Sequence, residues 1–230
     1  MIKAVVFDLD HTLFDRYATF KEMILNTPYS ELPFKENLSK EQIIDLMIYA
    51  DKNYIYYGWD RVIEYYKSAN CLSSAADTDS FFNKYIAPMF LKFAVPFDYA
   101  IPTLNTLKSM GLKIGLITNG IIKVQSRKLK MLKLDNIFDR VLISEEVGEN
   151  KPHRKPFDVM AQRLNLPANE IAYAGDNPIN DIMGAQNAGY LPIWVKTVGD
   201  YNMPALQMPE YQVETVKEIP DIINRINGGN

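Results

Sequence analysis

The chain has 230 residues, of which 47% are hydrophobic and 23% are charged, with a formal net charge of −3. This composition is typical of a folded protein with one large domain, or with a core domain that carries a smaller insert. A slightly acidic chain lacks the basic surface that binding to nucleic acid or to an anionic membrane requires.

Targeting signals and disulfides are also limited by the sequence. No apolar run approaches the ~20 residues of a transmembrane helix. The apolar stretch before Asp8 is too short for a signal peptide. The single cysteine, Cys71, rules out an internal disulfide and suits a reducing compartment. The sequence therefore predicts a cytoplasmic protein.

The first predicted strand covers residues 4–7, a run of apolar and mostly β-branched or aromatic residues that indicates burial on both faces. The strand is followed at once by two carboxylates, Asp8 and Asp10, and by the hydroxyl of Thr12. In α/β sheets, ligands bind beyond the carboxyl ends of the strands. These side chains are therefore candidates for a functional site.

Helical spacing replaces strand-like alternation over residues 16–93, which predicts a small helical insert. Within it, Ser39 and Gln42 have the spacing of a capping box that starts a helix. The insert holds 16 of the 27 aromatic residues, Tyr56 and Tyr57 among them. We expect most of these rings to fill the core of the insert, and a minority could stack on a planar part of a substrate.

After Pro96, predicted helices and strands alternate to the end of the chain. The predicted strands are 113–117, 140–143, 171–174, 192–195 and 211–213, and the predicted helices are 101–110, 122–132, 157–164, 181–188 and 219–226. This alternation predicts an α/β fold with a doubly wound, Rossmann-like parallel sheet. The predicted domains are a core of residues 1–15 and 94–230 and an inserted α-helical bundle cap of residues 16–93.

Three predicted strands end in polar groups, and adjacent parallel strands would bring these groups to one edge of the sheet. The first of these strands is followed by Asp8 and Asp10, the second by Thr118 and Asn119, and the third by Asp176. A further loop supplies a cation, Lys151. Several carboxylates close together need a cation to remain ionised, and oxygen ligands favour Mg²⁺. The sequence thus predicts a site for an anion and a Mg²⁺ ion.

The same four segments resemble, in order, the four motifs of the haloacid dehalogenase (HAD) superfamily of phosphohydrolases. The resemblance rests on Asp8-Leu9-Asp10-His11-Thr12, Thr118-Asn119, Lys151-Pro152 with Phe157, and Gly175-Asp176 with Asn180-Asp181. Because the insert lies between the first two motifs, it resembles the first-type helical cap of this superfamily. The resemblance covers essentially the whole chain.

The resemblance implies a two-step reaction. Asp8 would be the nucleophile that forms an aspartyl-phosphate, and Asp10 would protonate the leaving group and then activate water. Mg²⁺ would be held by the carboxylates of Asp8 and Asp176 and by the backbone carbonyl of Asp10.

The resemblance also implies how the phosphoryl group is bound. Thr118 and the backbone N–H of Asn119 would donate hydrogen bonds to it, and Lys151 would offset its charge. Asp181 would order Lys151 or the surroundings of the metal.

The third motif departs from the usual pattern. His153 and Arg154 stand where the superfamily usually has an acid and a proline. A second lysine followed by proline, Lys155, is a rival to Lys151, which we prefer because Phe157 then keeps its usual spacing. We expect His11 and His153 to be surface or loop residues rather than catalytic groups.

Asp10 favours phosphoryl transfer over dehalogenation, because dehalogenases of this superfamily lack the second acid. The pattern around Gln125, Lys128 and Leu129 is similar to that of pyrimidine 5′-nucleotidases and of N-acylneuraminate-9-phosphatases. The predicted partner is a small phosphate monoester, with a nucleoside 5′-monophosphate as one candidate. A sugar-phosphate phosphatase, a phosphomutase and a silent phospho-ligand-binding member remain alternatives. A receiver-type signalling domain is disfavoured, because its nucleophilic acid lies on a middle strand.

Overall fold

The computed structural model describes residues 1–55, 58–197 and 208–228. The chain divides into two compact units, one formed by Met1–Asp15 with Pro96–Asn230 and the other by Arg16–Val95. The sequence-based boundary placed the return to the first unit at residue 94. Tyr56 and Tyr57, which were assigned to the insert, lie outside the described residues. The role of the second unit as a cap that selects substrate stays a prediction.

A parallel sheet is the centre of the first unit. In the described part of the chain it has six strands, in the order β5-β4-β1-β6-β7-β8. Their bounds are Ala4–Phe7 (β1), Lys113–Thr118 (β4), Arg140–Ile143 (β5), Ile171–Gly175 (β6), Leu191–Val195 (β7) and Tyr211–Val213 (β8). Every predicted strand is present, with its ends within one residue of the prediction. The predicted α/β fold with a parallel sheet is confirmed.

The central strand β1 sets where the polar groups emerge. It lies between β4 and β6 and runs parallel to both, with Phe7 opposite Leu116 and Ala174. All four of its residues are buried, as expected for a strand covered on both faces. Because the three strands run in one direction, the segments that follow them leave the sheet at the same edge.

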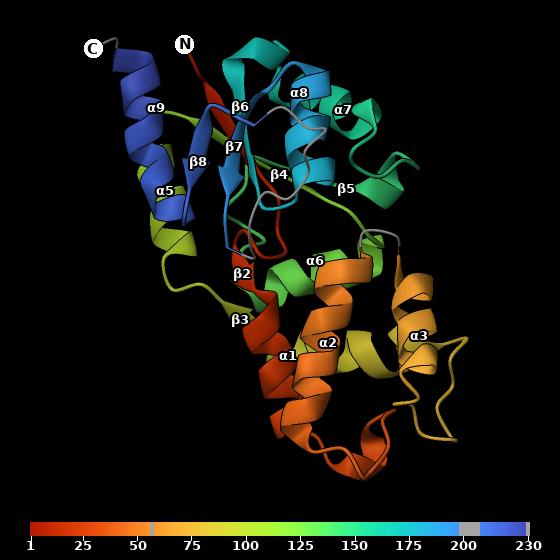
Figure 1. Cartoon of the computed structure of the whole chain (residues 1–230). Helices are drawn as coiled ribbons and strands as arrows, with labels where there is room; N and C mark the ends of the chain where they lie inside the picture. The colour runs from red at the N-terminus through yellow and green to blue at the C-terminus, as the bar shows by residue number, and fades with distance from the viewer. Residues whose placement is uncertain (56–57, 198–207, 229–230) are drawn as a thin grey trace. The chain divides into compact units, whose positions relative to one another are not determined.

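Helices cover both faces of this sheet (Figure 1). On one side lie α5 (Ala100–Ser109) and α9 (Ile219–Gly228), and on the other lie α7 (Arg154–Leu164) and α8 (Gly184–Ala188). A further helix of this unit, α6 (Ile122–Met131), follows β4.

The helix predicted at 181–188 begins differently. Its first part is a π-helical turn, Pro178–Met183, and only then does α8 follow. The start moves because the side-chain oxygen of Asn177 accepts hydrogen bonds from the backbone N–H groups of Ile179 and Asn180, which caps the turn.

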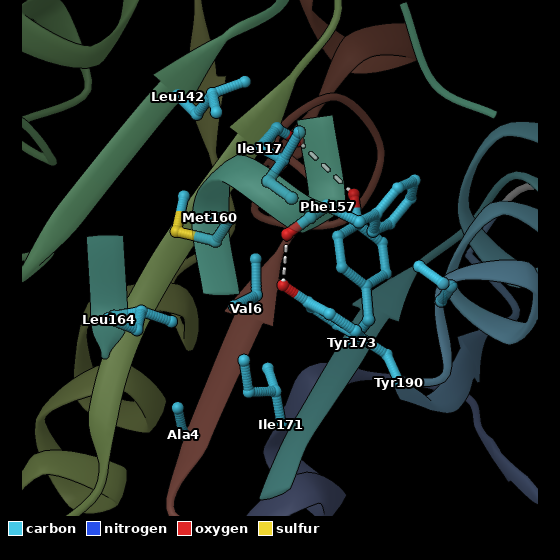
Figure 2. Packing of buried hydrophobic residues seen from close by; sticks show 12 residues of the cluster. Ala4, Val6, Ile117, Leu142, Phe157, Met160, Leu164, Ile171, Tyr173 and Tyr190 are labelled. Atoms are coloured by element: carbon cyan, nitrogen blue, oxygen red, sulfur yellow. Dashed lines mark hydrogen bonds between the residues drawn. The ribbon is translucent and has the colours of Figure 1, made fainter. Parts of the chain in front are cut away.

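The core between the sheet and the helices α7 and α8 is a continuous apolar cluster (Figure 2). Its members are Ala4, Val6, Ile117, Leu142, Phe157, Met160, Leu164, Ile171, Tyr173, Ala185, Ala188 and Tyr190. Close packing in this layer depends on Gly184, because a Cβ atom there would lie 2.8 Å from the Phe157 ring and 3.2 Å from the Cα atom of Pro152. The glycine therefore lets α8 approach α7.

The second unit is helical. It contains α1 (Arg16–Leu25), α2 (Lys40–Tyr54), α3 (Trp59–Ser68) and α4 (Ala87–Phe93), with a π-helical turn at Phe82–Ile86. The predicted capping box is confirmed: Ser39 Oγ accepts from the Gln42 N–H at 3.2 Å, and Gln42 Oε1 accepts from the Ser39 N–H at 2.8 Å. Two short strands at the points where the chain leaves the first unit and returns to it, β2 (Phe14–Asp15) and β3 (Val95–Pro96), form a separate two-stranded sheet.

Many aromatic rings of the second unit pack against each other. Phe34 meets the rings of Tyr66 and Phe81 edge to face, with centroids 5.4 and 6.4 Å apart. All three residues are buried, so they belong to the core of this unit, whereas Tyr49 is exposed.

Among the described residues, no helix combines the length and the apolar character needed to cross a membrane.

Candidate functional site

The loop after β1 is held tightly by its own backbone and by two buried leucines. The Asp8 N–H donates to the carbonyl of Ala174 on β6, at 2.9 Å, and the Leu13 N–H donates to the carbonyl of Leu9, also at 2.9 Å. Both leucines are fully buried. His11 takes a left-handed backbone conformation with φ 62°. These contacts fix the direction in which the loop presents its carboxylates.

Both histidines lie outside the helices and strands, and the expectation that neither is catalytic stays a prediction. His11 lies in the loop after β1, as expected, and is buried there. His153 is exposed and precedes α7.

Lys151 is the central cation of the site. Its Nζ atom lies 2.6 Å from Asp8 Oδ1, 2.7 Å from Asp181 Oδ1, 2.8 Å from the Tyr173 hydroxyl and 3.1 Å from the carbonyl oxygen of Ile117. The side chain is 2% exposed. Burial alone would lower the pKa of Lys151, but the charges of Asp181 and Asp8 outweigh burial and raise it. The lysine is therefore held as an ammonium ion.

The backbone of Lys151 is also held in place. The side chain of Asn119 donates to the Lys151 carbonyl at 3.0 Å and accepts from the Lys151 N–H at 2.8 Å. By contrast, the rival Lys155 has a half-exposed side chain and lies 3.5 Å from Glu149. Of the two candidate lysines, Lys151 is the one that the structure places beside Asp8 and Asp181.

Three carboxylates surround this lysine. Asp8, Asp176 and Asp181 each offer an oxygen, and these oxygens lie within 4.8 Å of one another. Burial raises the pKa of Asp8 to about 7, and the charges of Asp181 and Asp10 add to this effect while Lys151 opposes it. Burial and the charges of Asp181 and Asp8 raise the pKa of Asp176 as well. The single positive charge of Lys151 does not balance the negative charges of three ionised carboxylates. A divalent cation bound between them would supply the missing positive charge.

The donor set fits Mg²⁺, since it consists of oxygen atoms only. Asp181 is already engaged on both oxygens: Oδ1 accepts from Lys151 and Tyr173, and Oδ2 accepts from the Asn177 N–H at 3.0 Å. Asp8 and Asp176 are therefore the carboxylates best suited to hold the ion. The side chain of Asp10 is not part of this group of three carboxylates, whose third member is Asp181. The ligand predicted on Asp10 is its backbone carbonyl.

The strand end at Gly175 requires a residue without a side chain. A Cβ atom there would lie 2.5 Å from both Cγ and Oδ2 of Asp181. The next residue, Asp176, is positioned by the indole N–H of Trp194, which donates to its carbonyl at 3.0 Å. The Thr12 hydroxyl lies 3.4 Å from Asp176 Oδ1. The fourth motif therefore keeps its glycine because the carboxylate of Asp181 occupies that space.

The carboxylate of Asp10 forms an ion pair with Lys128 of α6, which is not among the predicted site residues. The Nζ atom of Lys128 lies 3.0 Å from Asp10 Oδ1 and 2.9 Å from Oδ2. This lysine is buried, and its ammonium lies over the Phe14 ring, 5.1 Å from the centroid. The ion pair fixes both oxygens of the Asp10 carboxylate.

Thr118 also has a partner on α6. The side-chain amide of Gln125 donates to the Thr118 hydroxyl and, at 3.2 Å, to the carbonyl of Asn119. Because the hydroxyl accepts this bond, its own proton can be donated elsewhere. Gln125 and Lys128 lie three residues apart on one helical face, and that polar i, i+3 pair on a buried face is the signal that could have identified them.

The fold and the site together define a class of α/β proteins in which an aspartate follows the central strand of a parallel sheet. The chain matches the haloacid dehalogenase-like hydrolase family over residues 5–195 and belongs to that family. The family predicted from the four motifs is thereby confirmed.

Comparison with individual proteins gives relatives over the full length and over part of it. The chain is 29% identical to glyceraldehyde 3-phosphate phosphatase of Methanopyrus kandleri, over 98% of this chain and 99% of that one. It is 31% identical to pyrimidine 5′-nucleotidase YjjG of Escherichia coli over 133 residues, which are 57% of this chain and 58% of that one. The crystal structure of HAD-hydrolase YfnB of Bacillus subtilis shares the fold, with a TM-score of 0.77 at 20% identity over 97% of this chain and 99% of that one.

Proposed function

We propose that this chain is a Mg²⁺-dependent phosphatase that hydrolyses small phosphate monoesters through an aspartyl-phosphate on Asp8. The observation that carries the proposal is the grouping of Asp8, Lys151 and Asp176 at the end of the central strand, with Asp10 two residues further on. A nucleophilic carboxylate, a fixed ammonium ion and a second acid are the groups that phosphoryl transfer by way of an acyl phosphate needs.

The proposed roles follow from the contacts of each residue. An oxygen of Asp8 attacks phosphorus, while Asp10 gives a proton to the departing alkoxide and then takes one from the water that hydrolyses the intermediate. The Thr118 hydroxyl, whose oxygen accepts from Gln125, donates to a phosphoryl oxygen. Lys151 offsets the charge of the same group.

The carboxylates of Asp8 and Asp176 and the backbone carbonyl of Asp10 are the proposed holders of Mg²⁺. When bound, the ion supplies the positive charge that lets an anionic phosphate approach an anionic nucleophile. Asp181 stays paired with Lys151 and so keeps the lysine beside Asp8.

The proposed substrate class is a phosphorylated three-carbon sugar or a similar small monoester. Full-length similarity to a glyceraldehyde 3-phosphate phosphatase supports this choice, because that match includes the second unit. Similarity to a pyrimidine 5′-nucleotidase covers little more than half of the chain and makes nucleoside 5′-monophosphates the second candidate. The proposed location is the cytoplasm, in keeping with a buried, unpaired Cys71.

Phosphate release from a panel of esters tests the proposal. The panel contains glyceraldehyde 3-phosphate, other sugar phosphates, purine and pyrimidine 5′-monophosphates and an aryl phosphate, each with Mg²⁺ and with a chelator. We expect turnover that needs the metal and is fastest on triose phosphate. Turnover concentrated on nucleotides would keep the chemistry and change the substrate. A folded protein that binds these esters without releasing phosphate would contradict the proposal and favour a mutase or a silent binder.

Stabilisation by Mg²⁺ should depend on pH in a defined direction. The folded-state pKa of Asp8 is raised from 3.8 to about 7, so without metal this group costs stability as pH rises from the lower value through the higher one. Metal needs the ionised carboxylates, and Mg²⁺ should therefore raise the melting temperature more at about pH 8 than at about pH 5.5. Calorimetry at both values measures this, with Asp176→Asn as a variant that should lose most of the increment. An equal increment at both pH values would contradict the assignment.

Asp10→Asn should separate the two kinds of leaving group. An alkoxide needs a proton to depart and an activated aryl oxide does not, so we expect turnover of alkyl esters to fall by about 10²–10⁴-fold, and of aryl esters by less. The ratio of kcat/KM values for the two esters measures the difference. Equal losses on both would argue that Asp10 does not protonate the leaving group.

A further inference from the structure

Tyr173 is a fully buried tyrosine whose hydroxyl lies beside Lys151 and Asp181. It lies on β6, and its ring packs edge to face on Phe157 with centroids 5.2 Å apart. The hydroxyl lies 2.8 Å from Lys151 Nζ, 3.1 Å from Asp181 Oδ1 and 3.4 Å from the carbonyl oxygen of Ile117. Figure 2 shows it directed from the apolar cluster toward Ile117.

The Tyr173 hydroxyl differs from the other oxygens around Lys151 because it can both accept and donate a hydrogen bond. An ammonium ion has three hydrogens, and four oxygens lie within 3.1 Å of Nζ. Two of these belong to carboxylates and one to a backbone carbonyl, which only accept. The Tyr173 hydroxyl can accept from Lys151 and at the same time donate to Asp181 or Ile117. It therefore links the lysine to the fixed frame of the sheet.

This link matters once Asp8 has reacted. When Asp8 becomes an aspartyl-phosphate, the negative charge beside Lys151 moves from the carboxylate oxygens to the phosphoryl oxygens, so the direction of the attraction on Nζ changes. The carboxylate of Asp181 attracts the ammonium throughout. The Tyr173 hydroxyl occupies the same oxygen of Asp181 and holds Nζ from another direction.

We propose that Tyr173 is a positioning residue that keeps the Lys151 ammonium beside the phosphoryl group throughout the reaction. The inference rests on the function proposed above, in which Lys151 offsets the phosphoryl charge. Its effect should appear in the chemical step rather than in substrate binding, because a small displacement of a catalytic charge lowers the rate steeply.

The test compares Tyr173→Phe with Tyr190→Phe. Tyr190 is also buried in this cluster, its ring also packs on Phe157, and its hydroxyl donates to the Phe157 carbonyl at 2.7 Å (Figure 2). Each variant removes one buried hydroxyl and keeps its ring. We expect Tyr173→Phe to lower kcat by about tenfold with KM changed by less than about twofold, and Tyr190→Phe to leave both within about twofold. Thermal melting shows whether the two variants lose similar stability.

A second readout does not depend on turnover. Amine-reactive labelling, quantified by peptide mass spectrometry, reports how well Lys151 is held, with the half-exposed Lys155 as internal reference. Tyr173→Phe should raise labelling of Lys151, and Tyr190→Phe should not. Unchanged kcat and labelling in Tyr173→Phe would overturn the inference, as would equal losses in both variants. A wild-type protein without turnover would overturn the proposed function instead, and the labelling result would then decide the role of Tyr173.

Discussion

Asp8→Asn should lower phosphatase turnover by more than about a thousandfold, because an amide cannot act as the nucleophile that forms the acyl phosphate. The fold should survive, since the substitution is close in size and leaves the buried strand β1 and the bond from the residue 8 N–H to Ala174 in place. Turnover of an aryl ester, circular dichroism and thermal melting together measure the two halves of this expectation.

The aryl ester is chosen because it needs no proton for its leaving group, which keeps any effect on Asp10 out of the comparison. Asp158→Asn is a matched control, an aspartate of the same unit whose exposed carboxylate pairs with Arg154 on α7. It should keep full activity. An Asp8→Asn protein that retains more than about a tenth of the wild-type rate would contradict the nucleophile assignment.

Lys151→Met should damage both stability and activity. The substitution leaves Asp8 and Asp181 buried without their shared cation, and removing one partner of a buried ion pair costs about 3–5 kcal/mol. We expect that loss in the free energy of unfolding at about pH 8 without Mg²⁺. Because Lys151 lowers the already raised pKa of Asp8, Asp8 in the variant takes up a proton more readily, and the loss should shrink at about pH 5.

Lys155→Met is the matched control for this variant. Its side chain is half exposed and 3.5 Å from Glu149, so its removal should change the free energy of unfolding by no more than about 0.5 kcal/mol and leave turnover intact. Urea unfolding and phosphate release on both variants test the pair. Loss of turnover in Lys155→Met with activity retained in Lys151→Met would reverse the choice of lysine.

The sheet and the meeting point of its strand ends could be predicted because they depend on local pattern. A short apolar run followed directly by Asp8 indicates a buried strand with a polar end, and the same reasoning applies at Thr118 and Asp176. The order of elements then restricts the topology, since a parallel sheet with short right-handed crossovers brings such ends to one edge. Ser39 and Gln42 were likewise predictable, because a capping box is set by residues three apart.

The contacts across long stretches of sequence could not be predicted in this way. Lys128 pairs with Asp10 from 118 residues away, and its spacing from Gln125 on α6 does not show which carboxylate it meets. Tyr173 occupies a strand position that apolar residues usually fill, so only its hydroxyl contacts reveal its part in the site. Hydrophobic spacing shows which face of a helix or strand is buried, but it does not show which side chains meet across two elements.

Trapping the acyl phosphate tests the central claim most directly. The enzyme is mixed with Mg²⁺ and an aryl phosphate, quenched within the first turnover, treated with borohydride and digested for peptide mass spectrometry. Borohydride reduces an acyl phosphate to an alcohol and leaves a free carboxylate unchanged. We predict reduction at Asp8, dependent on substrate and metal, with Asp10 and Asp176 unmodified. Rapid phosphate release under the same conditions, with Asp8 intact in every peptide, would contradict the account.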